Sequence, residues 1–248
     1  MHLPKIAPAA PLALSGIALA LLIVAPFGSR FGWWQYGFGL YRLMPASGLL
    51  AAAAFILSLL ILVRERRQLA ARSIALLAVA LVLSAALVYV PWRYVYIRRT
   101  LPAIHDITTD LDHPPTFSAV LSARAAERAN RVDDRSPELA QQQKAAYPDV
   151  GPLVTPLPVG RAFNEALLVA QSMPGWTVVA SDAGTGRIEA FEQSRWFRFN
   201  DDVVIRVTSD GAGSRIDMRS TSRQGVSDYG VNAARIREYF KVLSRRIG

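Results

Sequence analysis

The sequence predicts an N-terminal transmembrane region followed by a soluble α+β domain, in which an antiparallel sheet carries helices on one face. Three observations predict this architecture: long apolar runs without charge, an abrupt change to a soluble composition after them, and strand and helix periodicities toward the C-terminus. We expect residues 1–100 to form the membrane region and residues 101–248 to form the soluble domain. The transmembrane helices are predicted at about 10–27, 45–63 and 73–92.

The net charge of +9 comes from the predicted membrane region. This region holds 10 of the 28 Lys and Arg and one of the 19 Asp and Glu, which leaves 18 of each sign in the soluble domain. A nucleic-acid partner needs a basic surface on the folded, solvated part of a protein. We therefore expect no nucleic-acid partner and attribute the excess charge to membrane anchoring. The sequence has no cysteine, which excludes disulfides, thiol nucleophiles and Cys-ligated metal sites.

Each apolar run is long enough to cross a bilayer once. The runs are residues 6–29, 43–63 and 73–92, and Lys or Arg bounds each of them. A helix rises about 1.5 Å per residue, so roughly 20 apolar residues cross a hydrocarbon core of about 30 Å. The alternatives are buried helices of a soluble protein and, for the first run, a cleaved signal peptide, although no A-x-A-like site follows it. The runs contain no charged residue, which argues against ion-coupled transport by this chain alone.

Arginines between the second and third runs predict the orientation. Residues 64–72 read RERRQLAAR, and short loops dense in Lys and Arg stay cytoplasmic. The N-terminus with Lys5 is then cytoplasmic and the C-terminal domain periplasmic, in a multi-pass protein of the bacterial inner membrane whose first partner is the lipid bilayer. Aromatic residues before the second run and at the end of the third fit an interfacial belt on the outer side. Other arginines oppose this orientation, because it places them outside: Arg30, Arg42, Arg93, Arg98 and Arg99.

The soluble domain begins with an extended segment at 101–117, whose paired prolines forbid helix. A helix is predicted at 118–131, and a polar surface segment follows at 132–148, with a short helix inside it as one option. After a short apolar segment at 153–157, a helix with one apolar stripe is predicted at 159–173, where a Pro-Gly pair ends it.

Four strands and a final helix complete the predicted domain. The strands are expected at 176–181, 187–193, 197–208 and 214–223. Glycines in the connections 182–186 and 210–213 permit the positive φ angles of hairpin turns. Apolar and charged residues alternate plainly in the last strand, which predicts a sheet covered on one side. The final helix is predicted at about 229–247, with Ser227 or Asp228 as its cap.

Two stretches of the soluble domain resemble a known family. They are HDITTDLDHPPTF at 105–117, and FRFNDDVVIRV through DMRSTSRQGVSDYGVNAARIR between 197 and 237. Both are similar to the bacterial and plastid family catalogued as domain of unknown function 1499, over essentially all of residues 101–248. The resemblance implies the α+β fold and an extracytoplasmic location, and the family carries no established activity. Its closing motif corresponds to Arg219, Ser220, Ser222, Gly225, Ser227, Asp228, Gly230, Asn232, Ala233 and Arg235.

Five potential metal ligands occur close together in the extended segment. They are His105, Asp106, Asp110, Asp112 and His113. Imidazole and carboxylate groups suit zinc or manganese, and a flexible loop could bring them together. The spacing fits no H-x-x-x-H template, and aspartates near prolines more often form turns that satisfy backbone amides. Metal binding and turn formation are both open interpretations of this segment.

Charged residues are expected on the outer face of the sheet, at Arg187, Glu189, Arg206, Arg215, Asp217, Arg219 and Arg223. Guanidinium groups bind phosphate or carboxylate bidentately, so these residues beside a hydroxyl-rich strand suit an anionic headgroup or polymer. Cross-strand salt bridges on a solvent-exposed face explain the same pattern without a function. The candidate ligand-binding residues are Arg206, Arg215, Asp217, Arg219, Ser220, Arg223, Ser227, Asp228, Asn232 and Arg235.

Catalytic templates fit the sequence poorly. Residues 225–229 begin like a serine nucleophile elbow, but Tyr229 replaces the final glycine. We therefore expect an integral membrane protein that presents a non-catalytic ligand-recognition or assembly domain and needs no cofactor. Its expected partners besides lipid are an anionic envelope ligand or another membrane protein. The alternative is a membrane-bound enzyme, with metal dependence as one option, that uses His105, Asp106 and Asp110.

Overall fold

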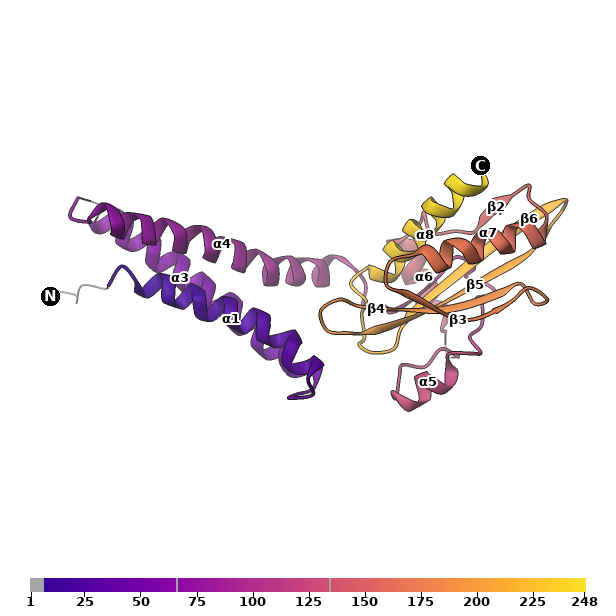
Figure 1. The fold of residues 1–248 in the computed structure, drawn as a ribbon, viewed down its shortest axis with the longest axis horizontal. Coiled ribbons are helices and arrows are strands. Elements are labelled where there is room, and N and C mark those ends of the chain that lie inside the picture. The colour runs from indigo at the N-terminus through magenta and orange to yellow at the C-terminus, as the bar shows by residue number, and fades with distance from the viewer. Residues whose placement is uncertain (1–6, 66, 134) are drawn as a thin grey trace. The chain divides into compact units, whose positions relative to one another are not determined.

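The computed structural model describes residues 7–65, 67–133 and 135–248. Two of the residues that entered the predicted orientation, Lys5 and Arg66, lie outside this part of the chain. The chain divides into two compact units, residues 1–97 and residues 98–248. The first consists of helices and the second combines a sheet with helices (Figure 1).

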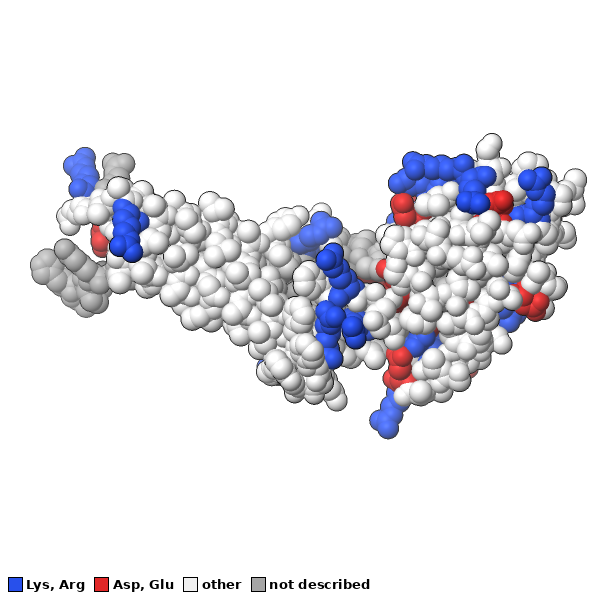
Figure 2. All heavy atoms as spheres, viewed as in Figure 1, with Lys and Arg blue, Asp and Glu red and all other residues white. Residues whose placement is uncertain are grey.

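Three helices of the N-terminal region are long and apolar enough to cross a membrane. They are α1 (Ala10–Arg30), α3 (Met44–Glu65), which the short helices α2 (Tyr36–Phe38) and η1 (Gly39–Leu43) precede without a break, and α4 (Ala71–Thr100). This confirms the prediction of three apolar helices. On the face drawn in Figure 2, the middle of these helices carries no charged side chain, and the blue residues lie near their ends. The helix α4 continues through Pro91 and ends later than the predicted span.

Small residues let α1 and α3 approach closely. Ala18 and Ala51 are fully buried between the helices, and the Ser47 hydroxyl donates a hydrogen bond of 2.7 Å to the Ala18 carbonyl. Gly48 on α3 faces α4, where an added Cβ would lie 2.6 Å from Cγ of Pro91. The three helices therefore pack through their smallest side chains, as helices do where lipid replaces water.

The second unit is built on an antiparallel sheet with the strand order β1-β6-β5-β4-β3, while β2 pairs with the opposite end of β6. The strands are β1 (Asp106–Thr108), β2 (Leu153–Thr155), β3 (Trp176–Asp182), β4 (Arg187–Gln193), β5 (Asn200–Asp210) and β6 (Gly213–Ser222). The helices are α5 (Leu121–Ala126), α6 (Pro137–Ala146), α7 (Val159–Ser172) and α8 (Val231–Ile247). An antiparallel sheet with helices confirms the predicted fold class. The helix predicted at 118–131 is shorter than expected, because only α5 forms within it.

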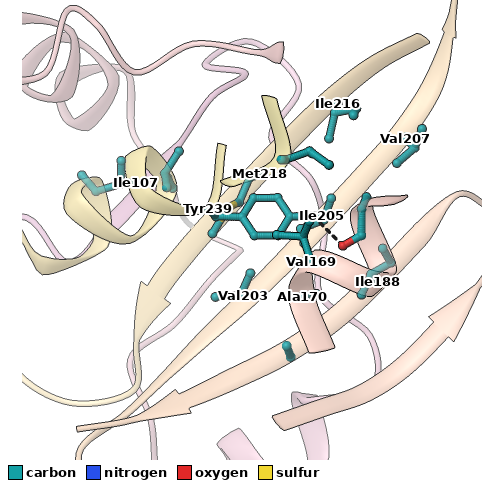
Figure 3. Packing of buried hydrophobic residues seen from close by; sticks show 14 of the residues in the cluster. Ile107, Val169, Ala170, Ile188, Val203, Ile205, Val207, Ile216, Met218 and Tyr239 are labelled. Atoms are coloured by element: carbon teal, nitrogen blue, oxygen red, sulfur yellow. Dashed lines mark hydrogen bonds between the residues drawn. The ribbon is translucent and has the colours of Figure 1, made fainter. Parts of the chain in front are cut away.

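The main core lies between the sheet and the pair α7 and α8. Alternate residues of β4, β5 and β6 point toward these helices, and Figure 3 shows several of them around Tyr239. The Tyr239 hydroxyl donates a hydrogen bond of 2.8 Å to the Ala166 carbonyl, so the ring bridges α8 and α7. Its ring also stacks on Trp176 of β3 with the centroids 5.4 Å apart. This single face therefore holds both long helices of the unit in place.

The opposite face of the sheet is covered as well. The helix α5 lies on the side of the sheet away from α7 and α8 (Figure 1). Phe117 and Val120, which precede α5, are buried against Val204 of β5. The expectation that this face is exposed to solvent is wrong, because Glu189, Asp217, Arg219 and Arg223 are all buried. We call residues 109–133, which cover these side chains, the covering segment.

Candidate functional site

Arg219 is buried at the centre of the face that the covering segment hides. Its Nε and Nη2 atoms donate hydrogen bonds of 2.9 and 2.7 Å to the Asp106 carboxylate on β1. The remaining donors reach the backbone carbonyls of Pro115 and Val132, at 3.3 and 2.6 Å. The guanidinium also lies 5.3 Å from the centroid of the Phe117 ring. Four of its five N–H donors are thus used to fix the covering segment to the sheet, and Arg219 is 3% exposed.

Asp202 on β5 accepts hydrogen bonds from two buried arginines. Arg223, directly after β6, binds it bidentately at 2.9 and 2.7 Å, and Arg124 of α5 binds it at 2.6 Å. Arg223 also donates to the Glu127 carboxylate at 2.6 Å. The hydrogen bonds that Arg223 donates to Asp202 outweigh burial and raise the pKa of Arg223 above its ordinary value. Arg223 therefore stays charged inside the protein, and acids of the protein itself bind both guanidinium groups.

A second group of charges occupies the end of the same face where β2 pairs with β6. Arg215 binds the Asp217 carboxylate at 2.8 and 3.0 Å, and Arg206 lies 2.8 Å from Asp110 and 3.2 Å from Asp217. Partial burial acts to raise the pKa of Asp110, but the His113 amide and the two guanidinium groups together lower it below its ordinary value. Asp110 therefore behaves as a paired carboxylate and not as a proton donor near neutral pH.

Glu189 on β4 anchors the covering segment through its backbone. Its carboxylate accepts hydrogen bonds from the amides of Ser118, at 2.9 and 3.1 Å, and of Val120, at 3.2 Å. These amides immediately precede α5, where the first turn of a helix leaves amides without partners. A fully buried carboxylate of the sheet therefore satisfies the start of a six-residue helix.

The helix-covered face holds a separate polar group around Arg235 of α8. Its guanidinium donates to Asp201 at 2.7 Å and to Ser220 at 2.9 Å, and it also contacts Glu192 and Asn232. These partners come from three neighbouring strands and from α8 itself. The group ties the helix to the sheet, in a position where an unpaired guanidinium would be costly.

The Asp228 carboxylate binds amides at the start of α8, where Gly230 occupies the N-cap position. This carboxylate accepts hydrogen bonds from the amides of Gly230 at 2.9 Å and Asn232 at 2.8 Å. Burial, the largest effect, raises the pKa of Asp228 above its ordinary value of 3.8, and the nearby Asp201 charge adds to the shift. Gly230 has φ of 83°, a conformation that glycine adopts at little cost. Of the two predicted caps, Ser227 and Asp228, the Asp228 side chain binds an amide of α8, although neither residue occupies the N-cap position.

The five candidate metal ligands do not come together in the structure. Asp106 pairs with Arg219 and lies 3.4 Å from Arg135, and Asp110 pairs with Arg206 and Arg215. Asp112 and His113 are exposed, and the His105 backbone carbonyl accepts hydrogen bonds from the Ser222 amide and the Asn232 side chain. Within the described ranges, no three His, Asp or Glu side chains are placed to hold a metal ion.

The candidate ligand-binding residues divide between the two faces of the sheet. Five lie beneath or beside the covering segment: Arg206, Arg215, Asp217, Arg219 and Arg223. Ser220, Asn232, Arg235 and Asp228 belong to the helix-covered face, and the Ser227 hydroxyl accepts a hydrogen bond from the Tyr229 amide. The structure therefore gives no single site that contains all ten.

The sequence interpretation missed several members of these networks. Glu127, Asp201, Asp202, Glu192 and Arg135 all bind residues that it had singled out, and Arg124 binds Asp202. One signal was present, because Asp201 and Asp202 are two consecutive acids directly before an apolar run at 203–205. Consecutive strand residues point to opposite faces, so each face needed a basic partner for its acid.

A pocket of about 440 Å³ opens between α5 and residues 129–133. Its wall includes the apolar side chains of Phe117, Leu121 and Val132, and Arg128 and Arg131 also line it. Arg128 is exposed, whereas Arg131 pairs with the neighbouring Asp133 at 3.2 Å. The pocket combines apolar surface with basic groups, the composition that suits an anionic group attached to an apolar body.

A family model described as "Protein of unknown function (DUF1499)" matches residues 106–243, more than half of the chain. The chain belongs to the DUF1499 family. The match begins at Asp106 on β1 and ends at Leu243 on α8, so it contains both polar networks and the covering segment of this DUF1499 domain.

No curated protein matches the DUF1499 chain significantly in sequence. Two solved structures are similar to part of it. The crystal structure of Ara h 8.0201 has 11% sequence identity and a TM-score of 0.24, and the match covers 39% of this chain and 93% of that one. The crystal structure of TTHA0849 from Thermus thermophilus has 12% identity and a TM-score of 0.21, with coverage of 39% and 85%. Similarity at this level carries no functional argument.

Proposed function

We propose that this protein is a non-catalytic recognition protein, whose three apolar helices anchor a ligand-recognition or assembly domain at the outer face of a bacterial inner membrane. One observation carries the proposal: the acids and bases that could react are bound to one another inside the second unit. Arginine binds the carboxylates of Asp106, Asp202 and Asp217, so the oxygen lone pairs of these residues accept hydrogen bonds from within the protein. A general base or a metal ligand needs such a lone pair free.

In this proposal the recognition site is the pocket beside α5. The pocket is held in shape from below, because Arg124 and Arg219 lie 5.8 and 5.3 Å from the Phe117 ring and are themselves fixed by carboxylates. A preformed site loses little conformational freedom when a ligand binds. The exposed Arg128 at its edge favours a ligand with a carboxylate or phosphate group.

Two alanines of α5 offer a matched test of the pocket. Ala125 and Ala126 are both exposed, but only Ala125 lines the pocket. The full chain, Ala125→Trp and Ala126→Trp would each be extracted from native membranes in lipid nanodiscs, and native mass spectrometry would identify what each retains. We expect the first variant to lose a small anionic molecule that the wild type and the second variant keep. Equal retention by all three, or retention of nothing by the wild type, would contradict the proposal.

The orientation has its own test. The arginine-rich segment at 64–72 supports a cytoplasmic connection between the second and third helices, which makes the C-terminus external. Alkaline phosphatase fused after Gly248 is active only outside the cytoplasm, and green fluorescent protein exported in unfolded form fluoresces only inside. We expect an active phosphatase and a dark fluorescent fusion, and the reverse pattern would overturn the outer location.

A further inference from the structure

The loop between β4 and β5 has a composition unlike the rest of the second unit. Residues 194–199 read SRWFRF, so two arginines lie among three aromatic residues. The Trp196 side chain is 57% exposed, and Arg195 and Arg198 are exposed beside it. We call residues 194–199 the aromatic tip. The exposed ring is amphipathic, and tryptophan is the residue type enriched at membrane–water interfaces.

The aromatic tip has a defined conformation. The Ser194 amide donates to the Phe199 carbonyl at 2.8 Å, and the Ser194 hydroxyl accepts from the Phe199 amide at 2.8 Å. The rings of Phe197 and Phe199 stack with their centroids 5.4 Å apart. The tip therefore presents Trp196 from a closed turn, and a contact made by this residue would need little further ordering.

The arginines of the aromatic tip differ from those inside the unit. Among the residues that the structure describes, neither Arg195 nor Arg198 pairs with a carboxylate, whereas Arg219, Arg223 and Arg235 each do. The Arg195 guanidinium lies 6.0 Å from the Trp196 ring. The tip thus offers free positive charge next to an amphipathic ring, and anionic lipid headgroups complement this combination.

The strand pairing places the aromatic tip at one end of the sheet, and the chain reaches that end directly from α4. Asp201 at the start of β5 pairs with Ser222 at the end of β6, and Asp106 at the start of β1 pairs with Thr221. Residues 101–105, which follow the last residue of α4, therefore lie at the same end as the tip. The loop that follows β6 begins at the same end of the sheet, and the Val226 side chain in this loop is 73% exposed.

We propose that the aromatic tip docks on the anionic surface of the bilayer that holds the chain, with Trp196 in the headgroup layer and Arg195 and Arg198 bound to lipid phosphates. Each arginine favours contact with an anionic membrane by about fivefold, and the indole ring adds its preference for the interface. The contact restrains the unit at one end of its sheet and leaves the pocket beside α5 to its own ligand. This inference rests on the membrane anchoring in the proposed function and not on its ligand site.

The absence of cysteine makes the contact measurable in the full chain. Trp196→Cys carries the fluorophore NBD in reconstituted vesicles, and Ala212→Cys in the exposed β5–β6 turn is the matched control. The eleven residues of β5, at roughly 3.3 Å each, separate the two positions by about 36 Å. Lipids with a nitroxide just below the headgroup quench a fluorophore that touches the membrane.

We expect strong lipid quenching at position 196 and little at position 212 in vesicles of phosphatidylcholine with about one-third phosphatidylglycerol. Arg195→Glu and Arg198→Glu should each reduce the contacting fraction relative to the free fraction by at least about fivefold. With both arginines in place, vesicles of phosphatidylcholine alone should reduce the contacting fraction to the same extent. Equal quenching at the two positions, or no response to either charge reversal, would overturn the proposal. A fluorophore shielded from water but not quenched by lipid would indicate a protein contact and would also overturn it.

Discussion

Asp202 is a single carboxylate that binds two buried arginines, one of which also binds Glu127. Arg124 and Arg223 both hydrogen-bond to Asp202, and all three side chains are almost inaccessible to water. Their charges cannot be hydrated, so the energetic role of this residue follows from what its removal leaves behind. A buried cation that has lost its partner is far more costly than an exposed one.

Asp202→Asn should therefore lower the free energy of unfolding by about 3 to 5 kcal/mol. Urea unfolding of the full chain in detergent micelles, followed by near-ultraviolet circular dichroism, measures this loss. The control is Asp149→Asn, because Asp149 and its partner Arg237 are both largely exposed and such pairs contribute under about 1 kcal/mol. A loss from Asp202→Asn as small as the loss from the control would show that the buried network is not needed for folding.

Asp228 gives the fold a pH dependence of opposite sign to that of a paired carboxylate. Burial raises its pKa in the folded protein above the ordinary value of 3.8. Its stabilising contribution is therefore fully present below pH 3.8 and is lost as the pH rises through the raised pKa. Asp228→Asn removes this titration. It keeps one oxygen that can accept an amide at the start of α8 and loses the other, because the two Asp228 oxygens accept the Gly230 and Asn232 amides separately.

The measurement compares the free energy of unfolding of the wild type and of Asp228→Asn across this range of pH. We expect the variant to gain stability relative to the wild type as the pH rises through the raised pKa of the Asp228 carboxyl group. A constant difference between the two proteins would mean that the Asp228 carboxyl group does not titrate differently on folding.

At the scale of elements, the covering segment depends on the sheet for its structure. The helix α5 has six residues, which is too short to be stable alone. Glu189→Ala removes the carboxylate that accepts the amides of Ser118 and Val120, so we expect residues 118–126 to lose protection from hydrogen exchange. The strands β5 and β6 should stay protected, and Gln193→Ala, at an exposed position of β4, should change neither region. Unchanged exchange in α5 would contradict the anchoring role of Glu189.

Turn glycines and the alternation in the last strand were enough to predict the four strands β3 to β6 and to place Arg215, Asp217 and Arg219 on one face. They could not predict the environment of that face. The residues Arg215, Asp217 and Arg219 give the same pattern whether water or another segment lies above them. The covering segment was not recognisable as a cover, because it has one short helix and because backbone carbonyls and a distant carboxylate, Glu189, hold it in place. The arginines beneath the covering segment therefore have the same sequence pattern as exposed arginines.

At the scale of the whole molecule, the apolar helices and the aromatic tip would make two kinds of membrane contact. The three helices are long enough to span, so their removal from lipid would expose whole apolar surfaces to water. We expect the full chain to remain with vesicles during an alkaline carbonate wash. Arg195→Glu and Trp196→Ala should remain equally well, because the helices alone are sufficient for attachment. Release of the wild type into the supernatant would contradict membrane anchoring.

Dissolved salt should distinguish the interior of the second unit from its surface. Mobile ions weaken interactions between charges that face water, over a distance of about 8 Å at physiological ionic strength, and they act much less on charges from which water is excluded. The bidentate pairs of Asp106 with Arg219 and of Asp202 with Arg223 lie out of reach of these ions. Concentrated sodium chloride should consequently leave the melting temperature of the unit almost unchanged, while it loosens any hold that Arg195 and Arg198 have on phospholipid.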